Sequence, residues 1–427
     1  MAADDALLIG TTTAGLSLDA PVFLSLDDRR RHMHVIGKTG TGKSTLLYSM
    51  MLQDLEAGRG FALLDPHGDL AKSVIDSVPP ERTNDVLYFN PGDLEHPIGF
   101  NLLDNVSLDS RPLVTAHVVA AFKHVWPDSW GPRLEQILRN GVALLLDNPG
   151  STLLGLSRLL VDESYRARLL SNCKNPIVRL FWTQQIADWG DGFAAEAMSP
   201  VQNKVDAILS PPILRNIIGQ PKSTINLTGI MNGHRVLIAN LSKATLGEGP
   251  AHLLGAFLAT AFAQAAESRA SIPEHERVDF YLYADEFQNF ATDSFATILS
   301  EARKWRLSLT LSHQFLDQLT DALRGAVLGN VGSLVAFRVG AKDAKTIAAE
   351  IGIENPEALS SLPNFSAWAM LMRDGNPAGT QRVATVEPHA LAFGREGAVT
   401  ARTRARSTRP RHIVEEKINR FLRPPHD

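Results

Sequence analysis

A glycine-rich run lies between an apolar strand-like segment and an apolar helix-like segment near the start of the chain. In such a run the backbone N–H groups converge on phosphate oxygens, helped by the positive end of the following helix. The pattern G-x-x-x-x-G-K followed by Ser or Thr is matched in full by Gly37-Lys38-Thr39-Gly40-Thr41-Gly42-Lys43-Ser44. We expect Lys43 to reach the β- and γ-phosphates and Ser44 to bind Mg²⁺, with Thr45 beside them. The run therefore predicts a site for ATP and magnesium.

An acidic pair later in the chain supplies what hydrolysis needs beyond phosphate binding. In "FYLYADEFQNF" a strand-like apolar run leads into Asp285 and Glu286. We expect Asp285 to hold the magnesium shell and Glu286 to polarise the attacking water as a general base. A solvated acidic pair at a strand end is the alternative, and without the phosphate loop it is the better interpretation. Together the two motifs favour ATP hydrolysis.

Two further polar patterns accompany the acidic pair. The run "LSLTLSHQ" ends in Gln314, whose amide we expect to sense the γ-phosphate. The helix-like segment "FATILSEARKWRLSL" carries Arg303, Lys304 and Arg306. A cation on a rigid element at the rim can complete the site of a neighbouring subunit, because the transferred phosphoryl group develops charge. The alternative is a basic helix end favoured by the helix dipole.

Short apolar runs bounded by Gly, Pro and Asp must position these groups. Their nearly continuous apolarity is typical of parallel strands covered by helices on both faces. The sequence therefore predicts an α/β core with a mainly parallel sheet. We expect strands within the segments 32–37, 60–66, 85–91, 234–242, 278–286, 307–313, 333–340 and 367–375.

The pattern of the chain changes between residues 105 and 219, where apolar residues recur at helical spacing and no such strand occurs. We expect an all-helical domain, 105–219, inserted into a nucleotide-binding domain formed by 1–104 and 220–394. The remaining residues, 395–427, begin with six arginines against one glutamate in "REGAVTARTRARSTRPRH" and end in a short amphipathic helix. They are either a solvated tail or an arm that contacts phosphates or another subunit.

The net charge of the chain limits how it can contact nucleic acid. The net charge of −4 over 427 residues argues against a uniformly basic surface. Any contact with nucleic acid must therefore be local, in a groove or pore. Candidate contacts are Arg133, Lys204 and the arginines after Gly394, with solvated surface as the alternative. Those arginines include Arg402, Arg404, Arg406, Arg409 and Arg411.

Targeting and metal-binding signals are weak. The apolar run Leu253–Ala266 is too short to span a bilayer, and the N-terminus is acidic where a signal peptide is basic, so we expect a cytoplasmic protein. One cysteine, Cys173, allows no internal disulfide and no zinc knuckle. His67 in "LLDPHGDL" is interpreted as a turn residue, because no second ligand pattern accompanies it. No metal is predicted beyond Mg²⁺.

Several motifs in order resemble one family. The segments "RRRHMHVIGKTGTGKSTLL", "LLDPHGDL", "LYADEFQNF", "EARKWRLSLTLSHQ" and "GNVGSLVAFRVGAKDA" resemble the coupling-protein ATPases of bacterial conjugation and type IV secretion, within the wider HerA and FtsK group of hexameric DNA translocases. The resemblance runs from about Pro21 to Ile351. It implies a RecA-like fold, a ring of six subunits with ATP at their interfaces, and DNA in the central channel.

The resemblance also assigns roles residue by residue. It implies that Lys43 and Ser44 are the phosphate-loop pair, that Asp285 and Glu286 form the second motif, and that Gln314 is the sensor. Arg303 best matches the arginine finger, and Arg306 is the second candidate.

One departure from the family leaves the partner open. Membrane-bound coupling proteins carry N-terminal transmembrane helices, and this sequence shows none, so we expect either a shortened chain or a soluble member. Soluble members of the wider group include ATPases that work with nucleases in phage defence. We expect an ATP-driven DNA translocase. The alternatives are an ATP-gated scaffold or regulator of a nuclease or relaxase, and a motor that moves protein through a secretion channel.

Overall fold

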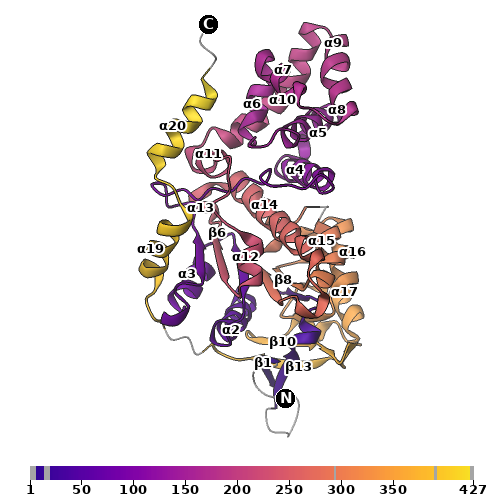
Figure 1. Cartoon of the computed structure of the whole chain (residues 1–427). Coiled ribbons are helices and arrows are strands. Elements are labelled where there is room, and N and C mark those ends of the chain that lie inside the picture. The colour runs from indigo at the N-terminus through magenta and orange to yellow at the C-terminus, as the bar shows by residue number, and fades with distance from the viewer. Residues whose placement is uncertain (1–5, 14–19, 293–294, 389–391, 424–427) are drawn as a thin grey trace. The chain divides into compact units, whose positions relative to one another are not determined.

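The chain folds into two compact units, which are coloured by residue number in Figure 1. The computed structural model describes residues 6–13, 20–292, 295–388 and 392–423, so the other residues of the predicted ranges 1–104, 220–394 and 395–427 lie outside it. The sheet unit comprises Met1–Phe89, Leu227–Ser242 and Phe262–Arg402, and the helical unit comprises Asn90–Asn226, Lys243–Ala261 and Thr403–Asp427.

The described residues of the sheet unit form an 11-stranded sheet in the order β2-β1-β13-β10-β9-β3-β8-β7-β4-β6-β5. Neighbouring strands are parallel from β9 to β5 and antiparallel from β2 to β9. The predicted α/β fold with a mainly parallel sheet is confirmed. The strands are β1 (Ala6–Thr12), β2 (Pro21–Ser25), β3 (Met33–Ile36), β4 (Phe61–Asp65), β5 (Val86–Phe89), β6 (Val236–Asn240), β7 (Phe280–Ala284), β8 (Leu307–His313), β9 (Ser333–Ala336), β10 (Ser366–Met370) and β13 (Gln381–Thr385). A separate hairpin pairs β11 (Met372–Arg373) with β12 (Asn376–Pro377).

The last predicted strand, within 367–375, is not parallel. Its residues form β10, which pairs antiparallel with both β9 and β13. Ala367 and Ala369 are buried while Trp368 and Met370 are only half-buried, so the strand has one fully covered face, as antiparallel strands commonly do. Because Trp and Met are themselves apolar, the run looked continuous in the sequence and hid this alternation.

The sheet is covered on both faces because alternate residues of its strands enter two separate cores. In β3, Val35 joins one core and Ile36 the other. The first core includes α2 and α3, and the second includes α17; Figure 1 shows these helices flanking the strands. The helices of the sheet unit are α1 (Leu26–Arg29), α2 (Lys43–Glu56), α3 (Asp69–Asp76), α12 (Leu227–Asn232), α15 (Phe295–Glu301), α16 (Asp321–Asn330), α17 (Ala341–Ile351) and α18 (Glu357–Ser360).

The helical unit contains every regular element between residues 105 and 219, and each of those elements is a helix. The unit is wider than this segment, since it also takes in 243–261 and 403–427. Its helices are α4 (Arg111–Val125), α5 (Pro132–Leu146), α6 (Leu154–Val161), α7 (Glu163–Ser171), α8 (Pro176–Leu180), α9 (Ile186–Asp188), α10 (Asp191–Leu209), α11 (Pro212–Ile218), α13 (Lys243–Leu246) and α20 (Arg411–Leu422). Two helices, α14 (Glu248–Glu267) and α19 (Glu396–Ser407), have residues in both units. Among the described helices, none has both the length and the apolarity needed to cross a membrane.

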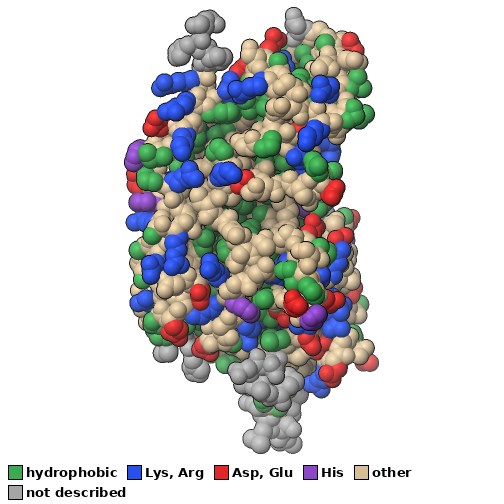
Figure 2. All heavy atoms as spheres, viewed as in Figure 1, with side chains coloured by type: hydrophobic (Ala, Val, Ile, Leu, Met, Phe, Trp, Pro, Cys, Tyr) green, Lys and Arg blue, Asp and Glu red, His purple; other side chains and the backbone are tan. Residues whose placement is uncertain are grey.

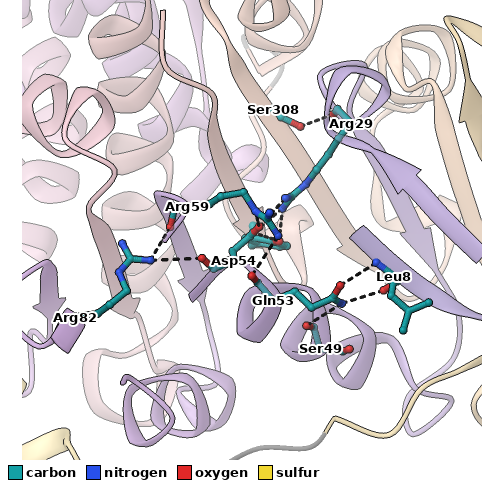
Figure 3. Close-up of polar contacts among 9 residues, drawn as sticks. Leu8, Arg29, Ser49, Gln53, Asp54, Arg59, Arg82 and Ser308 are labelled. Atoms are coloured by element: carbon teal, nitrogen blue, oxygen red, sulfur yellow. Dashed lines mark hydrogen bonds and ion pairs between the residues drawn. The ribbon is translucent and has the colours of Figure 1, made fainter. Parts of the chain in front are cut away.

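A buried charge network joins the helix after the glycine-rich run to the strand before the acidic pair (Figure 3). Asp54 of α2 accepts from Arg29 of α1 through both carboxylate oxygens, at 2.8 and 2.7 Å. Its oxygens also accept from Arg59 at 2.7 Å and from the Tyr283 hydroxyl of β7 at 2.6 Å. Burial alone raises the pKa of Asp54, but Arg29 and then Arg59 outweigh it and hold the pKa below its usual value. The network fixes α1, α2 and β7 to one another.

Removing the carboxylate of this network is expected to destabilise the fold strongly. The side chains of Arg29 and Asp54 are 1% and 0% exposed, so Asp54→Ala leaves a guanidinium buried without its counter-charge. We expect a loss of about 3–5 kcal/mol in the free energy of unfolding, measured by urea denaturation. Because the pKa of Asp54 is lowered by folding, this contribution is full above about pH 4 and is lost as the pH falls further.

A matched control is available on the surface nearby. Asp27 pairs with Arg30 but its side chain is 78% exposed, so Asp27→Ala should cost only about 0–1 kcal/mol. Equal losses for the two variants would contradict a special role for the buried network.

Candidate nucleotide site

The glycine-rich run forms a loop from the end of β3 to the start of α2. Gly40 and Gly42 have φ angles of 74° and 119°, in the left-handed region that side chains rarely adopt. Thr41 Oγ1 donates to the carbonyl of Lys38 at 2.7 Å, which closes the loop on itself. The predicted strand–loop–helix context is therefore present, with the first N–H groups of α2 directed to the loop side.

Lys43 lies inside this loop and is almost fully buried. Its Nζ donates to the carbonyl of Gly37 at 2.7 Å and lies 3.8 Å from Glu286 Oε1. Burial lowers the pKa of Lys43, while Glu286 and Asp285 act in the opposite direction. The ammonium group thus sits between the loop and the acidic pair, which is where a bound triphosphate would bring further negative charge.

Ser44 and Asp285 are brought into direct contact across the site. Ser44 Oγ donates to Asp285 Oδ2 at 2.9 Å. Burial, and after it the neighbouring Glu286, raises the pKa of the Asp285 carboxyl. A hydroxyl and a carboxylate are oxygen ligands of the kind that Mg²⁺ prefers, and a cation here would offset the cost of the buried charge. These two residues therefore fit the magnesium ion that the sequence predicts.

Glu286 is held by two amide side chains. Gln314 Nε2 donates to its Oε1 at 3.0 Å, and Gln288 Nε2 donates to its Oε2 at 2.8 Å. Glu286 itself has a φ angle of 45°, in the left-handed region, where non-glycine residues occur mainly at turns and functional sites. Gln314 was predicted to join the site and Gln288 was not. In the sequence, the only indication that Gln288 belongs to the site is its position two residues after Glu286.

Two buried histidines lie behind the loop, one on β3 and one at the end of β8. His313 Nδ1 faces the carbonyl of Phe315 at 3.1 Å and must donate to it, so His313 Nε2 accepts from His34 Nε2 at 2.6 Å. Burial lowers the pKa of His34 to about 3 and that of His313 well below its usual range. Both rings are neutral at pH 7, so they join the two strands without adding charge beside Lys43.

The arginine candidates lie away from these groups. Arg303 is exposed in the short 3-10 turn Ala302–Trp305, directly before β8, whereas Gln314 directly follows that strand. Since β8 has 7 residues, it separates the two positions by about 20 Å along the sheet. Arg306 is half-buried and pairs with Asp279 at 3.6 Å. Neither arginine is brought to Lys43 and Glu286 within one chain.

The turn after β4 has a structural explanation. The carboxylate of Asp65 accepts from the backbone N–H groups of His67 and Ala71, at 2.9 and 2.8 Å, and so caps the start of α3. The His67 side chain is exposed. This geometry agrees with the interpretation of His67 as a turn residue.

The candidate nucleic-acid contacts fall into two groups. Figure 2 shows basic side chains gathered over the C-terminal helix α20. However, Arg404 pairs with Asp93 at 2.7 Å, and Arg411 pairs with Glu95 at 3.2 Å and with Glu415 at 2.8 Å. These arginines therefore already have acidic partners within the helical unit.

The remaining candidates have other surroundings. Arg133 is exposed, with its guanidinium 4.7 Å from the centre of the Phe193 ring, and Lys204 is half-buried. The backbone N–H of Arg409 donates to the carbonyl of Pro97 at 3.3 Å, so this part of the arm is fastened to the unit. Arg402 and Arg406 are exposed. Contact of any of these residues with DNA remains a prediction.

Several solved structures have the same fold as this chain. The bacterial conjugative coupling protein TrwB in its unbound form superposes with a TM-score of 0.64, over 90% of each chain at 16% identity. The chain has the coupling-protein fold. TrwB in complex with ADP and Mg²⁺ gives a TM-score of 0.63 at 16% identity, over 92% of this chain and 97% of that one.

A second solved structure and a family model also match the chain. VirB4 of Thermoanaerobacter pseudethanolicus matches with a TM-score of 0.58 at 14% identity, over 91% of this chain and 98% of that one. Residues 8–151 match the family model of the central domain of the helicase HerA. No sequence match is found among curated proteins. The predicted RecA-like fold and the resemblance to the coupling-protein and HerA group are confirmed.

Proposed function

We propose that this protein is a magnesium-dependent ATPase that works in a ring, as a motor that moves DNA and not as a fixed scaffold. The observation that carries the proposal is the convergence of Lys43, Ser44, Asp285, Glu286 and Gln314 on one site. TrwB, which has the same fold, is known in complex with ADP and Mg²⁺ and with a non-hydrolysable ATP analogue. TrwB is a plasmid coupling protein, which supports the assignment to conjugation-type motors.

In this proposal the side chains divide the work of hydrolysis. Lys43 neutralises charge on the β- and γ-phosphates, and Ser44 and Asp285 hold the magnesium ion, which supplies further charge neutralisation when bound. Glu286 takes a proton from the attacking water. Gln288 and Gln314 hold its two oxygens in place, which fixes the orientation of the carboxylate. A carboxylate with fixed orientation needs little rearrangement in the transition state, which favours catalysis.

We further propose a homo-hexameric, cytoplasmic ring with DNA in its channel. The segment 105–219 is then an all-helical domain inserted into the nucleotide-binding domain formed by 1–104 and 220–394, and 395–427 form a basic arm. The exposed position of Arg303, at the edge of the sheet opposite to Gln314, suits an arginine finger that serves a neighbouring subunit. A secretion channel, a relaxase or a nuclease is the partner class that the fold suggests.

The response of ATP turnover to DNA tests the motor assignment. We expect double-stranded or single-stranded DNA to raise the steady-state rate of the wild type several-fold, because a translocase couples hydrolysis to its track. Lys43→Ala, assayed in parallel, gives the background from contaminating ATPases. A wild-type rate that exceeds this background but does not change when either kind of DNA is added would contradict the motor assignment. It would favour an ATP-gated scaffold.

A further inference from the structure

The phosphate loop opens into a cavity larger than a triphosphate needs. The cavity has a volume of about 810 Å³, within the range of sites that hold whole small molecules. Ser44, Thr45 and Asp285 line the end that binds phosphate and magnesium in the proposed function, while Tyr48 and Phe365 line the wall beyond it. Thr45 and Tyr48 are three residues apart on α2 and so share one face of that helix. The cavity thus continues from the phosphate end to a wall with two aromatic rings.

Phe365 is the unusual residue of this wall. Its φ angle is 61°, in the left-handed region that bulky side chains rarely adopt, and its side chain is 49% exposed. A large apolar ring gains little from folding when half of it stays in water. Strained backbone of this kind is found preferentially where a ligand is held.

The backbone of Phe365 is fixed from both sides. Its N–H donates to the carbonyl of Thr41, inside the phosphate loop, at 2.8 Å. Its carbonyl accepts from the N–H of Thr385 at 2.8 Å and from the Thr385 hydroxyl at 3.2 Å. A Cβ atom added to Gly42 would lie 3.1 Å from the ring atom Cδ1 of Phe365. The ring is therefore held against the loop at the point where α2 begins.

We propose that Phe365 is the residue on which the base of the bound nucleotide stacks. This inference rests on the proposed function, because it needs the triphosphate in the loop. Every nucleobase presents a flat face that an aromatic ring can cover, and such stacking contributes to affinity without reading the base edge. The backbone hydrogen bond from Phe365 to Thr41 keeps this residue beside the loop, so a base on its ring and the triphosphate are bound as one ligand.

The chemistry of the wall predicts which bases are accepted. An aromatic ring covers the face of a base and makes no hydrogen bond to its edge, so Phe365 itself does not distinguish one base edge from another. Stacking grows with the size of the base, so purine nucleotides should bind more tightly than pyrimidine nucleotides. Stacking on Phe365 alone should separate adenine and guanine only weakly.

Binding of a non-hydrolysable ATP analogue and of inorganic tripolyphosphate to the full chain tests this role. We expect Phe365→Ala to weaken binding of the analogue by about 5- to 100-fold and to leave tripolyphosphate binding unchanged, because only the first ligand has a base. Phe365→Trp should retain the affinity for the analogue. Phe23→Ala is the matched control, since Phe23 is a similarly exposed phenylalanine, 45%, that does not line the cavity.

The variant Phe365→Gly separates the effect of the ring on ligand binding from its effect on stability. Glycine adopts the left-handed region freely, so the melting temperature of Phe365→Gly should be no lower than that of Phe365→Ala, although both bind the analogue weakly. If both variants bind the analogue as the wild type does, the stacking role is wrong and the proposed ATPase function stands. If Phe365→Ala weakens analogue and tripolyphosphate equally, Phe365 shapes the loop and does not meet a base. A wild type that binds neither ligand overturns the proposed function as well.

Discussion

Glu286→Gln is expected to bind ATP about as tightly as the wild type while losing roughly 10²- to 10⁴-fold in kcat. The glutamine keeps the size of the side chain and can still pair with Gln314, but it cannot take a proton from water. An interaction needed only in the transition state lowers kcat without weakening ground-state binding. Steady-state turnover and the affinity for a non-hydrolysable analogue, measured on the same preparation, check both halves of the expectation.

The matched control for this change is Glu274→Gln, which removes an exposed carboxylate of the same unit. Its turnover should equal that of the wild type. Loss of analogue binding by Glu286→Gln, with an unchanged circular dichroism spectrum and melting temperature, would show that Glu286 organises the nucleotide site and does not act as the base.

Rings mixed from two inactive variants are expected to regain part of their activity. Lys43→Ala removes the cation inside the loop, and Arg303→Ala removes the proposed finger, for which comparable arginines contribute about 10³- to 10⁵-fold in rate. Within one chain Arg303 lies before β8 and Gln314 after it, so the two act together only across an interface. A mixed ring contains interfaces at which one subunit supplies Lys43 and its neighbour supplies Arg303.

The mixing experiment needs evidence that subunits exchange, for example from two differently labelled variants that co-purify. If exchange is shown and the mixture stays as inactive as its parts, then Arg303 acts within its own subunit or every site must be intact for any to turn over. Arg306→Ala is the next variant to test. We expect it to affect stability more than rate, because Arg306 pairs with Asp279.

The residues of the nucleotide site that directly follow a strand of the sheet could be predicted from the sequence. Parallel strands end at the same edge of a sheet, so the residues after β3, β7 and β8 had to meet, and they do: Lys43 lies 3.8 Å from Glu286, and Gln314 3.0 Å from the same carboxylate. Phe365 was not predicted. It precedes a strand and reaches the loop only because β10 runs antiparallel to β9, a direction that the sequence did not reveal.

Charged runs were the least informative part of the sequence. The run Arg29–Arg31 precedes the phosphate loop, and its members pair with Asp54, Asp279 and Asp28 in turn. Arg30 and Asp279 are 249 residues apart, and no local pattern shows such a partner. The same holds for Arg404 and Asp93, which the sequence separates by 311 residues. Counting arginines therefore overstates the positive charge that is free to meet DNA.

The buried pair of Arg29 and Asp54 also limits where this protein can bend. It fastens α1 to α2, and the Tyr283 hydroxyl fastens α2 to β7, so the nucleotide loop and the acidic pair are carried on a single stiff block. Gln288 and Gln314 lie outside that block, on turns that follow strands. If the protein is the motor proposed above, we expect loss of the γ-phosphate to act first on these two turns, so that a stroke begins there while the block keeps its shape.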